Sequence, residues 1–225
     1  MAGTYGDMQS RIADEITDAA LASQIQNAIQ DAIKHYERKK FYFNQKVAGF
    51  STVAGQEYYS SSDLADIATL IEIEAAAIAN SGVKSELVAE AFENIDAWQT
   101  SLSTGQPRSF AYYGQQIRLF PIPDAAYTVT LAYHYRLATL SAPSDTNAWM
   151  TDGEILIRES AKRRLAQDVV KEDGESQRAS PLELEELEEL LAETRRRRSK
   201  NRLHGEIYLF GMTRGGFDIN SGSVL

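Results

Sequence analysis

The stretch Phe41-Tyr-Phe-Asn-Gln45, followed by Thr52-Val-Ala-Gly-Gln-Glu-Tyr-Tyr59, decides the fold because the residue pattern changes there. Before it, apolar residues recur every three or four positions, as they do on one face of a helix. From Phe41 onward, aromatic and β-branched residues surround an Ala54-Gly55 turn, which predicts a hairpin. The chain therefore passes from helices into a β region near residue 41.

The β region is predicted to continue to about residue 150. Leu70–Ile73 alternates like a strand with one wet face, and Ser109–Tyr113 and Ile117–Phe120 predict a second hairpin. Tyr127–Tyr135 alternates most clearly of all. Residues 86–100 return to helical spacing, so one amphipathic helix is expected inside the β region.

Helices are predicted at both ends of the chain. Isoleucines at helical spacing indicate two opening helices before residue 40. Thr151-Asp-Gly-Glu154 reads as a capping box that starts a helix to about Lys171. Ser180-Pro181 combines a capping serine with proline at the first helical position, and predicts a second helix to about residue 200.

The last helix is expected to bury a leucine stripe and expose its carboxylates. Leu184, Leu187 and Leu191 recur at helical spacing and are predicted to face the core. The glutamates of Glu183–Glu193 are then read as a solvated face near the positive helix N-terminus, with arginines at the other end.

Together these segments predict an α+β fold. Residues 1–40 and 151–200 supply a helical core, made of an N-terminal helix pair and a C-terminal helix hairpin. Residues 41–150 form an inserted antiparallel β lobe, and residues 201–225 an extended C-terminal arm. A chain of 225 residues that is 43% hydrophobic can build such a core without disulfide bonds or structural metal ions.

Composition excludes several classes of protein. The chain has no cysteine, so disulfides and cysteine metal sites are ruled out, and a reducing cytosol suits it. The longest apolar run, Ala75–Ala79, is far shorter than the roughly 20 residues of a membrane span, so no membrane partner is expected. A net charge of -9 argues against tight, sequence-independent binding of nucleic acid as the main role.

Signals for catalysis are nearly missing. His35, His134 and His204 lie far apart in the sequence without metal-binding spacing, and are read as structural histidines. No glycine-rich phosphate loop or nucleophile-elbow motif is present. We therefore expect no enzyme activity, no metal and no cofactor.

One cluster of basic residues is a candidate binding site. It could contact nucleic acid, an acidic partner, or the acidic segment of an identical copy, or it could simply complement the helix dipole. The cluster consists of Arg195, Arg196, Arg197, Arg198 and Lys200. Tyrosines at Tyr112-Tyr113, Tyr133 and Tyr135 could stack bases, but at strand spacing they are more often core or interface residues.

The order of these motifs resembles the head-to-tail adaptor, or head-completion, proteins of tailed bacteriophages, especially short-tailed ones. The resemblance rests on the Phe41–Gln45 entry, the Thr52–Tyr58 hairpin, the Pro107–Asp124 block and the Tyr127–Tyr135 strand. It covers about residues 5–200. The last helix and the segment from residue 201 match nothing that can be carried over residue by residue.

The resemblance implies a structural protein of the virion, which would be present in the host cytoplasm during assembly. It would form a homo-oligomeric ring, commonly a dodecamer, beneath the portal protein. The ring would extend or close the DNA channel, offer a platform to tail or nozzle proteins, and let genome DNA pass without sequence-specific binding. The arginine cluster would face the ring or channel.

The C-terminal arm is expected to order on the portal, as binding tails do. Its candidate contact residues are Tyr208, Leu209, Phe210 and Phe217.

Two alternative functions of the protein remain open: a nucleic-acid-binding protein that uses the basic cluster at 195–202, and a cell-wall hydrolase of the tail.

Overall fold

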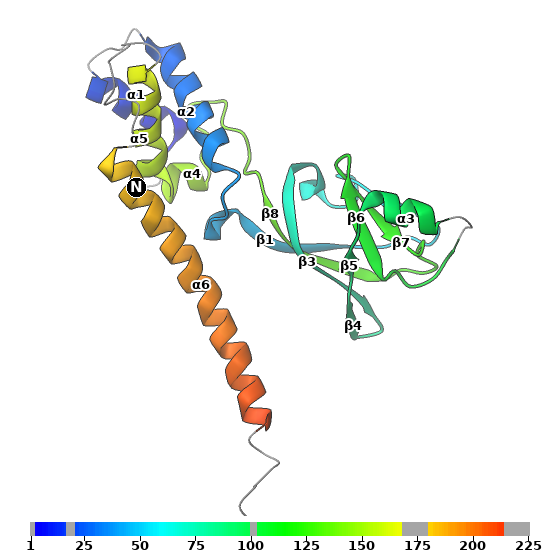
Figure 1. Cartoon of the computed structure of the whole chain (residues 1–225). Helices are drawn as coiled ribbons and strands as arrows, with labels where there is room; N and C mark the ends of the chain where they lie inside the picture. The colour runs from blue at the N-terminus through cyan, green and yellow to red at the C-terminus, as the bar shows by residue number, and fades with distance from the viewer. Residues whose placement is uncertain (1–2, 17–20, 100–102, 168–179, 214–225) are drawn as a thin grey trace, which may run out of the picture.

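The computed structural model describes residues 3–16, 21–99, 103–167 and 180–213, and only the backbone of residues 199–213. The fold is α+β, as predicted. Figure 1 shows a helical part and a β part side by side, and a long last helix that runs away from both. Each part has its own cluster of buried apolar residues.

The helical part joins the two ends of the described chain. Trp149 is its largest buried side chain and packs edge-on against Phe41 and Phe43. Isoleucines such as Ile12 and Ile29 fill the space between the helices. The helices are α1 (Tyr5–Ile16), α2 (Ala22–Tyr36), α4 (Ala148–Thr151), α5 (Glu154–Leu165) and α6 (Pro181–Thr213).

The β part consists of two four-stranded sheets. The first has the order β1 (Gln45–Ser51), β8 (Thr128–Tyr135), β3 (Leu70–Asn80) and β4 (Val83–Glu86), all antiparallel. The second has the order β2 (Tyr58–Tyr59), β7 (Gln116–Phe120), β6 (Ser109–Tyr113) and β5 (Val88–Ala89), with only β5 parallel to its neighbour. Short 3-10 helices, η2 (Tyr42–Asn44) and η3 (Ala65–Thr69), and helix α3 (Phe92–Trp98) complete it.

The two sheets share one core, because alternate residues of each strand point into the space between them. Val129, Leu131 and Tyr133 of β8 and Ile117 and Leu119 of β7 are all buried there. The alternation read in the sequence of residues 127–135 is therefore correct. The predicted hairpin of β6 and β7 is also confirmed, with a two-residue turn between paired residues Tyr113 and Gln116.

The hairpin predicted around Ala54-Gly55 is wrong. β1 pairs with β8 in the first sheet, whereas β2 pairs with β7 in the second. The turn exists, with Gly55 at φ 81°, but it carries the chain from one sheet to the other. Turn residues in the sequence predict only that the chain changes direction locally. Which strand a given strand pairs with depends on residues far away in the sequence.

The helix inside the β region is shorter than expected. α3 covers Phe92–Trp98, because Val88–Ala89 is already committed to β5 beside β6. The amphipathic spacing that we assigned to residues 86–100 thus combines a strand and a helix. Ile95 of α3 is buried, whereas both residues of β5 are exposed.

The helix predicted from Thr151 also begins differently. Asn147 caps α4, its side chain accepting a hydrogen bond from the backbone of Trp149 at 2.9 Å, and α5 begins after Gly153 without a side-chain cap. Glu154 therefore does not form a capping box with Thr151. In contrast, the Ser180 cap of α6 is confirmed, because its hydroxyl accepts from the backbone N–H of Glu183 at 3.0 Å.

The predicted extended arm is wrong for residues 201–213, because α6 continues to Thr213. Gly205 and Gly211 each weaken a helix by about 1 kcal/mol, but no proline interrupts the segment, and extending an existing helix adds a hydrogen bond for each residue fixed. Residues 214–225 lie outside the described part of the chain. Among the described residues, no helix is both long and apolar enough to cross a membrane.

Candidate partner-binding surfaces

Helix α6 is anchored to the helical part by a buried ion pair. Glu183 is fully buried, and Arg163 of α5 donates to its two carboxylate oxygens at 2.9 and 3.2 Å. The hydroxyl of Tyr36 in α2 donates to the same carboxylate at 2.7 Å. Three helices are therefore joined at one carboxylate.

The partners keep this carboxylate charged. Burial alone would raise the pKa of Glu183, but the hydrogen bonds from Arg163 and Tyr36 outweigh it and hold the pKa below its usual value. Burial and the bond to Glu183 raise the pKa of Tyr36, so its hydroxyl remains a donor. Because every member has a partner, the cluster is a structural joint.

This joint corrects the predicted orientation of α6. Glu183, Leu187, Leu190 and Thr194 recur at helical spacing, and this stripe faces the core, although Leu187 is only partly buried. Leu184, predicted to be buried, is 51% exposed. The helix is rotated relative to the expectation because Arg163 and Tyr36 supply a polar partner that an apolar stripe could not use.

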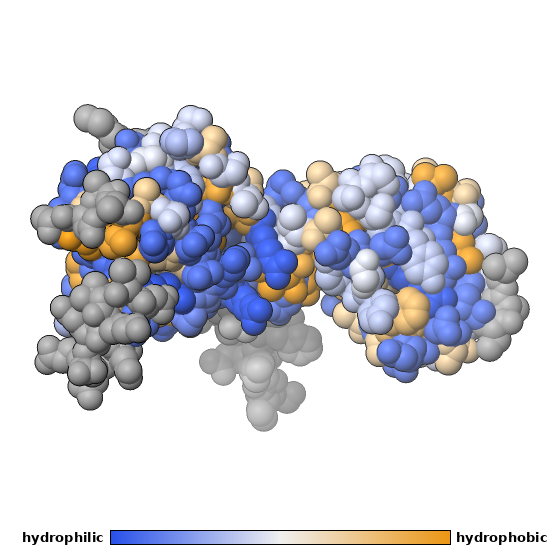
Figure 2. All heavy atoms as spheres, turned by 90° about the horizontal axis from the view of Figure 1, so that it is seen from above, coloured by the Kyte–Doolittle hydropathy of each residue, from blue (hydrophilic) through white to orange (hydrophobic). Residues whose placement is uncertain are grey.

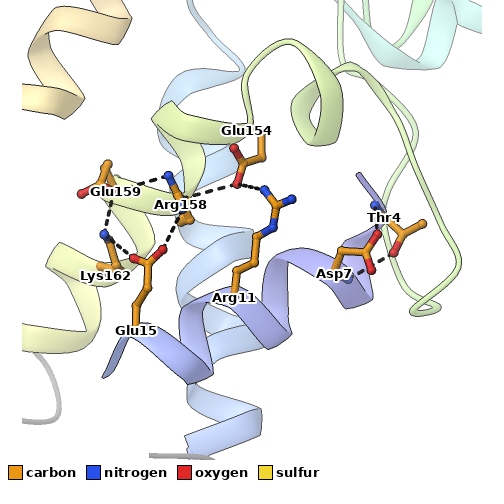
Figure 3. Close-up of polar contacts among 8 residues, drawn as sticks. All are labelled: Thr4, Asp7, Arg11, Glu15, Glu154, Arg158, Glu159 and Lys162. Atoms are coloured by element: carbon orange, nitrogen blue, oxygen red, sulfur yellow. Dashed lines mark hydrogen bonds and ion pairs between the residues drawn. The ribbon is translucent and has the colours of Figure 1, made fainter. Parts of the chain in front are cut away.

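Helices α1 and α5 are connected by a charge network, which Figure 3 shows between Glu15 on α1 and two cations on α5. Arg158 and Lys162 reach Glu15 at 2.7 and 2.6 Å, and Arg11 of α1 reaches Glu154 at 3.2 Å. These pairs hold α1 against α5 on this side of the helical part.

The basic cluster on α6 lies where the helix passes the start of the β part. Arg196 and Arg197 each pair with Glu193 at 2.7 Å, and Arg198 pairs with Glu74 of β3. The guanidinium of Arg197 also lies 3.7 Å from the ring centre of Tyr42. Of the cluster, Arg195 to Arg198 are all exposed. Much of the cluster therefore links α6 to residues of its own chain.

The remaining predicted contact residues lie at the far end of the chain. Tyr208, Leu209 and Phe210 belong to the last turns of α6. Lys200 lies earlier in the same helix, and all four are beyond the region where side chains are described. Phe217 lies outside the described residues. The structure thus brings none of them together with the arginine cluster in one described site.

The tyrosines and histidines whose side chains the structure describes do not form a site. Tyr133 is buried and donates to Asp66 at 2.5 Å, and Tyr112 donates to the backbone of Ile67 at 2.9 Å, so both belong to the β core. His134 is buried beside Asn44, while His35 is exposed. In the part of the chain that the structure describes, no group of three potential metal ligands comes together.

The surface around α3 was not predicted from the sequence. α3 covers the outer side of the second sheet, where buried Arg118 lies between the rings of Phe92 and Tyr58, 4.9 and 5.5 Å from their centres. Beside it, Trp98 and Tyr113 are 47% and 66% exposed. The sequence feature that could have predicted this surface is Arg118 among the apolar residues of β7. Neighbouring residues of a strand face opposite sides of the sheet, so Arg118 points away from the core.

Apolar residues on the outside are dispersed. The face seen in Figure 2 is mainly hydrophilic, with small hydrophobic patches over both the helical and the β part. Aromatic side chains are typical anchors of protein interfaces, so the α3 surface and the exposed length of α6 are the candidate binding surfaces.

Comparison with known families gives one match. The sequence profile described as SU10 adaptor protein matches residues 3–205, which include both the helical and the β part. No curated protein matches the chain at a significant level.

Proposed function

Because the chain belongs to the SU10 adaptor protein family, a family of phage head-to-tail adaptors, we propose that it forms a ring beneath the portal and joins the head to the tail. The ring would contain about twelve copies, extend or close the DNA channel, and offer a platform to tail proteins. The observation that carries this proposal is a family match that extends over both parts of the fold.

The architecture supports a role between two partners. The helical part and the β part each have a separate apolar core, so one can bind a partner without the other being rearranged. The joints at Glu183 and at Arg198–Glu74 connect α6 to both parts. Because α6 is held to both parts, a partner bound to one part would be kept at a defined position relative to a partner bound to the other.

The charge also fits a DNA channel. With a net charge of -9, the chain has no general attraction for phosphate, so DNA can slide past it. Three arginines of the cluster pair within the chain in the described structure: Arg196 and Arg197 with Glu193, and Arg198 with Glu74.

We further propose that the end of the chain binds the portal through Tyr208, Leu209, Phe210 and Phe217. Figure 1 shows the last turns of α6 leaving both parts of the molecule. Large apolar residues at such a position suit the groove of a partner.

The decisive experiment is native mass spectrometry of the full chain, alone and mixed with the portal protein of the same phage. We expect a ring of about twelve copies, preformed or assembled on the portal. A monomer or dimer that ignores the portal would overturn the proposal.

The role of the chain end needs truncations. A chain ending at residue 202 should keep both cores and its melting temperature, but lose portal binding. A chain ending at residue 213 separates the contribution of Phe217 from that of Tyr208–Phe210. Unchanged binding by the shorter chain would refute the role of the end while leaving the ring intact.

A further inference from the structure

An acidic stripe lies on α6 beside its buried stripe. Leu182, Glu185, Glu186 and Glu189 are spaced by three or four residues and so share one face of the helix. Glu185 and Glu189 are exposed, Glu186 is half-buried, and Leu182 is 44% exposed. Within the described part of the chain, none of the three carboxylates forms an ion pair. As far as the described residues go, the stripe therefore presents negative charge without an ion-pair partner.

The electrostatics of Glu186 agree with this picture. Burial raises the pKa of Glu186, and the neighbouring carboxylates Glu189, Glu154 and Glu185 raise it further. Like charges are thus concentrated at one place on the surface, where a cation from outside the chain would be stabilising.

A basic patch lies elsewhere on the helical part. Arg38 and Lys39 are exposed in the turn that follows α2, and Arg164 lies on the last turn of α5. Among the described residues, none of these three cations has a carboxylate partner. The Nε of Arg164 is buried, and no described residue accepts a hydrogen bond from it.

Two cations of this patch, Arg164 and Lys39, lie close enough to His35 to act on it. Burial lowers the pKa of His35, and the charges of Arg164, Arg163 and Lys39 lower it further. Arg163 is already committed to Glu183, so Arg164 and Lys39 remain available. The patch is a region of positive charge on a chain that is negative as a whole.

We propose that the acidic stripe of one copy docks on the basic patch of the next copy. This inference rests on the proposed ring and names the surfaces that would build it. The two surfaces differ and do not pair with each other within one chain. A contact between two different surfaces is head-to-tail, and it closes into a ring when its rotation permits.

The charges would mainly set the register of this contact. Exposed ion pairs contribute little affinity and are screened by salt, but they reject wrong arrangements and steer encounter. Leu182 contributes apolar area at the same place. The contact should therefore weaken as salt rises.

Two charge-reversed chains test the pairing. The first carries Glu185→Lys and Glu189→Lys; the second carries Arg38→Glu and Lys39→Glu. All four positions are exposed, so both chains should fold, which circular dichroism verifies. Each chain alone should self-associate at least about tenfold more weakly than the wild type at low salt. An equimolar mixture should assemble again, because each altered surface then meets its complement.

A matched control carries Asp14→Lys and Glu86→Lys, two exposed carboxylates that lie outside both proposed surfaces and outside α3, and should assemble like the wild type. Analytical ultracentrifugation measures all four samples and the mixture. The inference is overturned if either reversed chain assembles normally, if mixing restores nothing, or if the wild type stays monomeric at low salt.

The two proposals fail separately. Assembly that is lost by reversal and regained by mixing, without any binding to the portal, would retain this interface and remove the adaptor role. A ring on the portal that is indifferent to charge reversal would retain the role and remove the interface.

Discussion

Arg163 of α5 and Glu183 of α6 form a buried ion pair in which the guanidinium contacts both carboxylate oxygens. A buried charge is stable only with a well-placed partner, so this pair fixes how α6 is rotated. The acidic stripe and the arginine cluster are presented on the outside as a result.

Glu183→Gln should destabilise the protein. The change leaves the charge of Arg163 in a partly buried site without its partner, which should lower the free energy of unfolding by about 2–4 kcal/mol. Urea unfolding followed by circular dichroism measures it. The control is Glu185→Gln, an exposed position where a change within about 0.5 kcal/mol is expected. Equal effects of the two variants would contradict the joint.

The same pair should make stability depend on pH. The folded-state pKa of Glu183 lies below its ordinary value of 4.5, so the unfolded chain binds the proton more readily. The stabilisation is therefore complete above pH 4.5 and is lost as the pH falls through the folded-state pKa. The difference in unfolding free energy between wild type and Glu183→Gln should shrink as the pH falls below the ordinary pKa of 4.5 and through the lower folded-state pKa. A constant difference would show that the charge of Glu183 is not responsible.

Arg118→Met should release α3 from the second sheet. Arg118 donates to Glu57 at 2.5 Å and to Asp96 of α3 at 3.1 Å, so its loss removes the polar link to the helix. Backbone amides of Phe92–Trp98 should exchange with deuterium about tenfold faster or more, while those of α5 stay unchanged. Arg108→Met, at an exposed position without an ion pair among the described residues, is the control. Equal exchange in the two variants would refute the link.

Replacing Arg195–Arg198 by alanine should leave DNA affinity unchanged. The net charge of -9 disfavours phosphate binding, and Arg197 and Arg198 pair with Glu193 and Glu74. Fluorescence anisotropy with duplex DNA at about 50 and about 200 mM salt measures this. Salt-sensitive wild-type binding that the alanines abolish would favour the nucleic-acid-binding alternative.

The sequence predicted the elements whose signals are local. Helical spacing located α1 and α2, the Ser180-Pro181 cap located the start of α6, and strict alternation located β8. The β6–β7 hairpin followed from a two-residue turn between alternating segments. Each of these patterns involves only residues that are close in the sequence, so the element can be predicted without knowing the tertiary structure.

Tertiary structure decided which elements meet. β1 and β2 are separated by one short turn, yet they pair with β8 and β7 in different sheets, because sheet partners are chosen by long-range packing. Likewise, leucines and glutamates both recur at helical spacing along α6, so periodicity alone leaves its rotation open. Arg163 and Tyr36, far away in the sequence, decided it by giving Glu183 the partners that make a buried carboxylate stable.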